Sequence, residues 1–209
     1  MRRLLILLAI LFAAFWGCRL LIPKAEAQEK RTKRQLVIRG TPFPENIFIL
    51  VDASGSMTGP PYEKAVKEAM KIATQATDGM RLRFAVFGST LVWDSQGWIK
   101  CPDLEAVTLG HAFLLHASFM NPGDSTNLVE AMQEILKLED DPLGIVILTD
   151  AQPVYGANDA ATMILSENAK RKNAAVIGVI AIDPQEEDEA LGKVLAESGG
   201  SYIRIVTVK

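Results

Sequence analysis

The chain alternates short apolar runs with longer segments in which apolar residues recur at helical spacing. The runs at 47–51, 145–148 and 174–182 are almost continuously apolar, a pattern typical of strands buried on both faces. Over 62–76 the apolar residues return every three or four positions, which predicts an amphipathic helix. Buried strands that alternate with such helices indicate a parallel sheet covered on both faces.

The other elements are predicted from the same two periodicities. Residues 82–87 and 91–93 flank a short turn at 88–90, which suggests a hairpin. Further helices are expected over 103–115, from about 126, over about 160–172 and over 190–195, where two glycines end the helix, and a last edge strand is expected over 202–208. The predicted fold class is α/β, a doubly wound, mostly parallel six-stranded sheet with one antiparallel edge strand and helices on both faces.

Length and composition are those of one globular domain. The 209 residues are 49% hydrophobic and 22% charged, which suffices for a sizeable core and excludes disorder or a disulfide scaffold. We assign residues 45–209 to this domain. Residues 28–44, which are polar and basic with two prolines, are assigned to a linker or a strand that leads into it.

Residues 1–27 have the pattern of a signal peptide. Two arginines precede an uncharged, mostly apolar stretch at 4–18, which is short for a membrane span and typical of a signal peptide. Ala25-Glu26-Ala27 then provides a cleavage site of small residues, so Gln28 is expected to be the first mature residue. We therefore predict an exported protein, located in the periplasm, at the cell surface or in the medium.

Two other interpretations of this segment stay open. Trp16-Gly17-Cys18 weakly resembles a lipoprotein site, although bulky residues stand where small or aliphatic ones are preferred. An uncleaved anchor over 4–23 would hold the domain on the membrane. Because more basic residues follow this run than precede it, the positive-inside rule alone would place the domain in the cytoplasm. The short run and the cleavage site favour export.

Cleavage after Ala27 changes the charge and the cysteine content. It removes four basic residues and one acidic residue, so 18 basic and 24 acidic residues remain and the net charge is −6. A domain of this charge is not expected to bind nucleic acid by bulk electrostatics. Cys101 becomes the only cysteine, which excludes an internal disulfide, and we expect a buried, unreactive thiol.

Oxygen-bearing side chains follow the buried strands. Asp52, Ser54 and Ser56 come directly after the first of them, where ligands bind in open α/β sheets. Asp150 ends the second buried strand, and Thr126 lies in the turn that enters a helix. If the two strands are neighbours, the five side chains surround one point and form a ligand set for a hard divalent cation.

On these residues, 45–208 resembles a von Willebrand factor type A domain with a metal-ion-dependent adhesion site. The family's D-x-S-x-S motif, threonine and distal aspartate correspond to Asp52, Ser54, Ser56, Thr126 and Asp150. The resemblance implies a Rossmann-like fold and Mg²⁺ as the cofactor, with Mn²⁺ or Ca²⁺ as alternatives. It also implies that the serines and the threonine bind the ion directly, while the aspartates often act through water.

A site of this kind implies protein recognition. A ligand set richer in neutral hydroxyls than in carboxylates leaves the charge of the cation under-compensated, so the ion attracts an outside carboxylate. Mg²⁺ prefers octahedral geometry and keeps waters, one of which can give way to a Glu or Asp of a protein partner. The predicted function is therefore adhesion by an exported or membrane-tethered domain that is not an enzyme.

Three departures from the family pattern limit what the resemblance implies. Ala151 stands where a glycine is common, and Asp124 adds an acid two residues before Thr126. The last predicted strand is followed by no helix in this sequence, whereas adhesion receptors of the family carry a helix there that transmits changes at the metal. We therefore do not extend such long-range switching to this chain.

The same five residues also allow purely structural roles. Asp52 and Ser54 alone would serve to cap the helix near Pro61 or to bind turn amides, Thr126 would cap its own helix, and Asp150 would be a solvated strand end. A scaffold with an unoccupied site and a metal-assisted hydrolase are the alternative functions. Ser54 stands where aspartyl-phosphate enzymes need a second acid, and the sequence has no Gly-x-Ser-x-Gly motif.

The remaining candidate residues are given structural roles. His111 and His116 are five positions apart, which does not place both on one helix face, so we expect ordinary histidines rather than metal ligands. Trp93 and Trp98 are expected to be packing residues or contacts at the rim of the site. The acidic run at 186–189 is typical of the first turn of a helix.

Overall fold

The computed structural model describes residues 36–38, 40–117, 126–138, 140–150, 157–184 and 189–205. The predicted signal peptide, anchor and lipoprotein site lie outside these residues, as do Asp124, Ala151 and the acidic positions 186–188. In the described part of the chain, no helix is long and apolar enough to cross a membrane. The compact unit that contains the sheet and its helices lies within residues 35–209.

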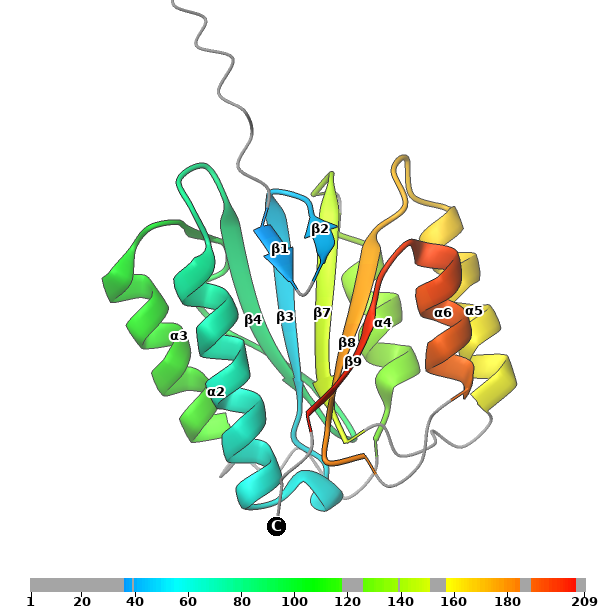
Figure 1. The fold of residues 1–209 in the computed structure, drawn as a ribbon, viewed down its shortest axis with the longest axis horizontal. Helices are drawn as coiled ribbons and strands as arrows, with labels where there is room; N and C mark the ends of the chain where they lie inside the picture. The colour runs from blue at the N-terminus through cyan, green and yellow to red at the C-terminus, as the bar shows by residue number, and fades with distance from the viewer. Residues whose placement is uncertain are drawn as a thin grey trace, which may run out of the picture. The chain divides into compact units, whose positions relative to one another are not determined.

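A seven-stranded sheet runs through the described residues (Figure 1). Its order is β5-β4-β3-β7-β8-β9, and β6 also pairs with β4. The strands are β3 (Asn46–Asp52), β4 (Arg81–Phe87), β5 (Leu91–Trp93), β6 (Ile99–Lys100), β7 (Leu143–Thr149), β8 (Val176–Ile182) and β9 (Tyr202–Ile205). From β4 to β9 the neighbours are parallel, whereas β5 and β6 run antiparallel to β4.

The predicted fold class is confirmed, with a small correction to the sheet. In the described residues, β6 makes a seventh strand and a second antiparallel one, where six and one were predicted. It has two residues, which is too few for the alternation that reveals a strand in a sequence. The hairpin predicted around 88–90 is formed by β4 and β5, in which Phe87 pairs with Leu91.

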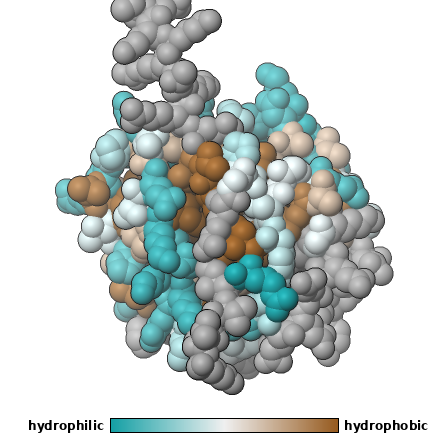
Figure 2. All heavy atoms as spheres, viewed as in Figure 1, coloured by the Kyte–Doolittle hydropathy of each residue, from teal (hydrophilic) through white to brown (hydrophobic). Residues whose placement is uncertain are grey.

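Helices cover both faces of the sheet (Figure 1). One face packs against α2 (Pro60–Gln75) and α3 (Leu104–Ala117), and the other against α4 (Leu128–Leu136), α5 (Ala157–Ala169) and α6 (Glu189–Ser198). Figure 2 shows hydrophilic residues along the outer side of α2, as expected for a helix whose apolar side faces the core. Strand β3 lies between the two layers with every residue buried.

The end of α6 has the predicted glycine cap. The helix is followed by Gly199 at a φ of +72°, a conformation that glycine adopts without strain. The Gly200 amide then donates to the Leu195 carbonyl at 3.1 Å, which satisfies one of the last carbonyls of the helix.

A hairpin of β1 (Leu36–Ile38) and β2 (Thr41–Phe43) contributes to the hydrophobic layer on the side of α2 and α3. Only a linker or a lead-in strand was predicted in this polar, basic segment. Phe43 is 1% exposed, and its ring lies on two glycines of neighbouring strands. A Cβ atom on Gly144 or on Gly178 would lie 2.7 Å from a carbon of that ring. The two glycines therefore form the seat of Phe43.

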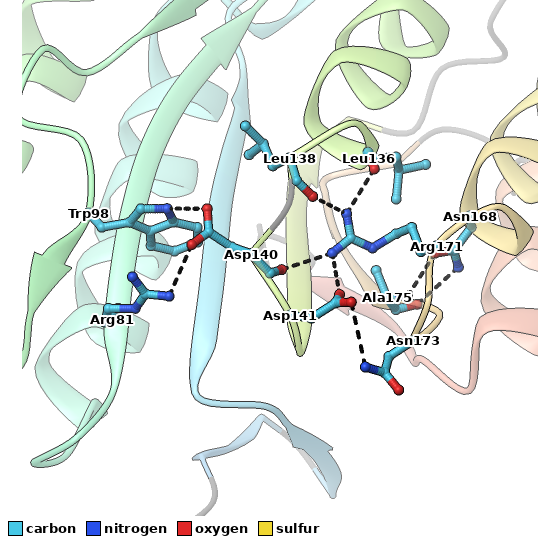
Figure 3. Close-up of polar contacts among 10 residues, drawn as sticks. All are labelled: Arg81, Trp98, Leu136, Leu138, Asp140, Asp141, Asn168, Arg171, Asn173 and Ala175. Atoms are coloured by element: carbon cyan, nitrogen blue, oxygen red, sulfur yellow. Dashed lines mark hydrogen bonds and ion pairs between the residues drawn. The ribbon is translucent and has the colours of Figure 1, made fainter.

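Arg171, which follows α5, ties together segments at the amino ends of the strands (Figure 3). Its side chain is 5% exposed and donates to the main-chain carbonyls of Leu136 (2.8 Å), Leu138 (2.6 Å) and Asp140 (2.8 Å). It also pairs with the Asp141 carboxylate at 2.5 Å. The last carbonyls of a helix have no partner within that helix. Arg171 therefore satisfies the end of α4 from outside.

Asp140 extends this network toward β4 (Figure 3). Its carboxylate accepts hydrogen bonds from Arg81 at 3.1 Å and from the Trp98 indole at 2.8 Å. Trp98 and Trp93 both meet the ring of Phe48 edge-on, with centroids 6.3 and 5.4 Å away. The two tryptophans are thus packing residues, one of the two roles expected for them.

Gly178→Ala is expected to destabilise the protein by about 1–3 kcal/mol, because the added methyl group overlaps the Phe43 ring. Gly192→Ala is the matched control, since a Cβ at this glycine of α6 meets no atom within 4 Å. That change is expected to stabilise by about 0.5–1 kcal/mol. Urea unfolding measures the stability of both variants. Equal effects would contradict the close packing of the Phe43 ring on Gly178.

Arg171→Met is expected to lower the free energy of unfolding by about 2–4 kcal/mol, because it removes the donor to three carbonyls and the cation that pairs with Asp141. Lys170→Met removes the adjacent charge, which is 65% exposed and pairs with Glu167 on the surface. It is expected to change stability by less than about 0.5 kcal/mol. Denaturant titration compares the stability of the two variants. If they are equally stable, the Arg171 network does not stabilise the protein.

Candidate metal centre

Strands β3, β4 and β7 end at the same level, and the candidate site follows them. Asp52 pairs with Phe87 of β4, and Val51 pairs with Leu148 of β7. The Ala53 amide still donates to the Phe87 carbonyl at 2.7 Å, one residue past the end of β3. The two buried strands are therefore neighbours, as the sequence-based hypothesis required, and the loops that follow them start at one edge of the sheet.

Asp52 is the most deeply buried residue of the candidate site. Its side chain is fully buried, and its Oδ1 accepts a hydrogen bond from the Ser54 amide at 2.9 Å. Its Oδ2 accepts one from the Thr149 hydroxyl at 2.7 Å. Burial raises the pKa of Asp52 in spite of these hydrogen bonds, which lower it, and the charge of Asp150 raises it further. A buried carboxylate in this situation is stabilised by a cation beside it.

Ser54 and Ser56 place two hydroxyl oxygens near this carboxylate. Ser54 is buried, whereas Ser56, in the short 3-10 helix η1 (Gly55–Met57), is exposed. Their Oγ atoms are 3.2 Å apart. Adjacent ligands of an octahedral Mg²⁺ ion, each about 2.1 Å from the metal, are about 3.0 Å apart. The two hydroxyls, which lie within hydrogen-bond distance of each other, have nearly this spacing, so both would fit on one ion of the kind that the resemblance implied.

Thr126 reaches the same edge at the start of α4. The helix is capped by Asn127, whose side-chain oxygen accepts a hydrogen bond from the Glu130 amide at 3.3 Å. The interpretation of Thr126 as the helix cap is therefore wrong. The Asn127 amide donates to the Gly88 carbonyl at 2.8 Å, and Gly88 directly follows β4. This bond ties the backbone beside Thr126 to the end of β4.

The interpretation of Asp52 and Ser54 as caps of α2 is also wrong. The N-cap of α2 is Gly59, where no side-chain hydrogen bond caps the helix. The other structural role considered for Asp52 and Ser54, binding the amides of a turn, holds in part, because the Ser54 amide donates to the Asp52 carboxylate. That bond uses the main chain of Ser54, while its hydroxyl meets the hydroxyl of Ser56.

Asp150 directly follows β7 and is 8% exposed. Its charge makes the smallest of the contributions that raise the pKa of Asp52, of which burial is the largest. With Thr126 beside the end of β4, all five predicted residues lie at the carboxyl ends of three adjacent strands. Exposure increases from Asp52 to Ser56, so this group of side chains opens toward solvent.

Two residues around the site were not predicted to take part in it. Thr149, interpreted only as a strand end, donates its hydroxyl to Asp52. Tyr62, interpreted as an apolar helix position, donates its buried hydroxyl to the Leu114 carbonyl at 2.7 Å. Burial raises the pKa of Tyr62, and the charge of Asp52 adds to this. The role of Thr149 could have been predicted, because it directly precedes Asp150 in the sequence. The role of Tyr62 could not, because its partner lies on another helix and no local pattern indicates the contact.

The other candidate residues stay outside the site. Among the residues that the structure describes, no three His, Cys, Asp or Glu side chains gather into a metal-binding group. His111 is half-buried and His116 exposed, both on α3. Cys101 is buried, as predicted, and burial raises its thiol pKa to about 11, with a smaller contribution from the charge of Asp103. Such a thiol is protonated at neutral pH and therefore unreactive.

Known proteins resemble this chain in sequence or in fold. Uncharacterized protein YwmC of Bacillus subtilis (strain 168) is 26% identical over 183 residues, which cover 79% of each chain. A solved von Willebrand factor type A structure from Catenulispora acidiphila superposes with a TM-score of 0.63 at 14% identity, over 80% of this chain and 40% of that one. An aerotolerance-related membrane protein from Bacteroides fragilis NCTC 9343 gives 0.57 at 18% identity, over 78% and 92%.

The family is settled by a direct match over most of the chain. The model of the von Willebrand factor type A domain matches residues 45–203, from the first residue of the predicted domain to the last strand of the sheet. The two structural likenesses agree with it at the level of the fold. This chain therefore belongs to the von Willebrand factor type A domain family.

Proposed function

We propose that this domain binds one Mg²⁺ ion at Asp52, Ser54, Ser56, Thr126 and Asp150 and recognises a carboxylate of a protein partner through that ion. The observation that carries the proposal is the fully buried carboxylate of Asp52, whose raised pKa reflects a charge that its surroundings do not compensate. The 3.2 Å spacing of the two serine hydroxyls supports an octahedral ion. Mn²⁺ and Ca²⁺ are the alternative cations.

The composition of this ligand set explains why the ion would attract a partner. Only two of the five residues are acids, and the other three offer neutral hydroxyls. Ser56 is exposed, so a ligand from solvent has access to the side of the ion that faces it. A Glu or Asp of another protein that replaces a metal-bound water would complete the coordination and supply negative charge.

We propose a binding module rather than an enzyme. Metal-assisted hydrolysis requires a group that takes up a proton from the attacking water. Both oxygens of Asp52 already accept hydrogen bonds, from Ser54 and from Thr149, which makes this carboxylate a poor candidate for that task. The hydroxyl-rich set favours the recognition of a carboxylate, which is the chemistry of adhesion.

We also propose that the domain works outside the cytoplasm, either exported or held on the membrane. The apolar stretch at 4–18 and the small residues that follow it support export. The likeness to an aerotolerance-related membrane protein supports work at a membrane. The partner is then a protein of the same compartment that presents an acidic side chain.

Mg²⁺ is expected to raise the melting temperature in a saturable way, because a ligand that binds only the folded state stabilises it by about 2.7 kcal/mol at a hundredfold excess over its dissociation constant. Asp52→Ala and Thr126→Ala are expected to lose this rise. Thr74→Ala, at an exposed threonine of α2 that bonds its own helix, is the matched control and is expected to keep it. Differential scanning fluorimetry with Mg²⁺, Mn²⁺, Ca²⁺ or chelator provides the measurement.

The control separates the candidate site from general effects of the salt. A rise that persists in both site variants would place the cation elsewhere. A folded wild-type protein that responds to no cation would overturn the autonomous metal site.

Asp52→Asn is expected to stabilise the metal-free protein at neutral pH by about 0.5–2 kcal/mol while it abolishes Mg²⁺ binding. The folded-state pKa of Asp52 is raised, so the folded protein holds a proton that the unfolded chain has already released. Metal-free stability is therefore expected to fall as the pH rises from the unfolded pKa to the folded one. Urea unfolding in chelator over about pH 4–8 measures this slope, which the variant is expected to flatten. A variant less stable than wild type in chelator would contradict the assignment.

A further inference from the structure

Helix α2 begins shortly after the Ser54–Ser56 turn and is held at its start by two long-range contacts. The Tyr62 hydroxyl donates to the Leu114 carbonyl of α3 at 2.7 Å. The Lys64 ammonium pairs with the carboxylate of Asp183. Because only three residues, 57–59, separate Ser56 from the first residue of α2, a shift of the helix start would also shift the turn.

Asp183 lies one residue past β8, at the same edge of the sheet as the candidate site. Its φ of +46° makes it the only residue other than glycine with a positive φ in the described part of the chain. Asp and Asn tolerate this conformation better than other side chains. A strained backbone persists where its surroundings hold it and is concentrated at functional sites. The ion pair with Lys64 is a contact of that kind.

The ion pair also crosses the strand that carries Asp150. The strand order is β3-β7-β8, and Lys64 belongs to the helix that follows β3, while Asp183 follows β8. Helix α2 contacts β7 and β8 as well as β3. The Lys64–Asp183 pair therefore links the two sides of β7 at its carboxyl end, where Asp150 stands.

We propose that the Lys64–Asp183 ion pair is a positioning brace for the candidate metal centre, which keeps the Ser54–Ser56 turn at a fixed spacing from Asp150. This inference rests on the proposed function. The two side chains are 31% and 30% exposed, and ion pairs with that exposure contribute little to global stability. The effect of the pair is therefore expected in the affinity for the ion rather than in the unfolding of the protein.

The test is calorimetric titration of the folded, full-length protein with Mg²⁺. Lys64→Met and Asp183→Asn each remove one charge, and asparagine keeps the tolerance for a positive φ. Each is expected to weaken Mg²⁺ binding by about tenfold, the low end of the effect of losing a group that orients metal ligands. Their combination is expected to weaken it no more than either alone, and Lys64→Arg is expected to retain most of the affinity. Lys71→Met, which breaks the Glu68–Lys71 pair on the same helix, is expected to bind like wild type.

The outcomes separate the brace from the metal site itself. Wild type that binds Mg²⁺, with Lys64→Met and Asp183→Asn equal to it, would overturn the brace and leave the proposed function standing. Wild type that binds neither Mg²⁺, Mn²⁺ nor Ca²⁺ would overturn both. Urea unfolding in chelator is the second readout, and a loss of stability with unchanged affinity would assign the pair a purely structural role, against the proposal.

Discussion

The parallel pairing of β3 with β4 on one side and β7 on the other is the constraint on which the rest of the structure depends. It makes three strands end together, so short loops from distant parts of the sequence start at one edge. It also buries β3 along its whole length, and Asp52, as its last residue, carries its carboxylate into the interior. The same pairing that stabilises the sheet therefore buries a carboxyl group whose desolvation outweighs its hydrogen bonds to Ser54 and Thr149.

The two ends of the sheet handle charge in opposite ways. At the amino end, three carbonyls and the Asp141 carboxylate accept hydrogen bonds from the Nη atoms of Arg171 (Figure 3). At the carboxyl end, two acidic residues, Asp52 and Asp150, end or directly follow the neighbouring strands β3 and β7. The charge at the amino end has a partner of opposite sign within the protein, whereas the carboxyl end is where we propose that a cation binds. The proposed binding site and the Arg171 network thus lie at opposite edges of one sheet.

Elements with many periodic residues were predictable from the sequence, and contacts between distant residues were not. The continuous apolar run of β3 and the helical spacing of α2 predicted both elements, and the residues around Asp52 predicted the turn that joins them. The alternative role of Thr126 as the cap of α4 was wrong by one residue, because Thr and Asn both suit that position and Asn127 occupies it. The Lys64–Asp183 pair joins residues 119 positions apart, so no local pattern announces it.

The hydrogen bond from the Asn127 amide to the Gly88 carbonyl limits where this domain can accept extra residues. Exposed hairpin turns usually tolerate such insertions. The turn at 88–90 is an exception, because its first residue also anchors the segment that carries Thr126. An insertion there would displace a threonine nearly forty positions away. Length variation in this hairpin is therefore restricted by the segment that begins α4 as well as by the two strands that the turn joins.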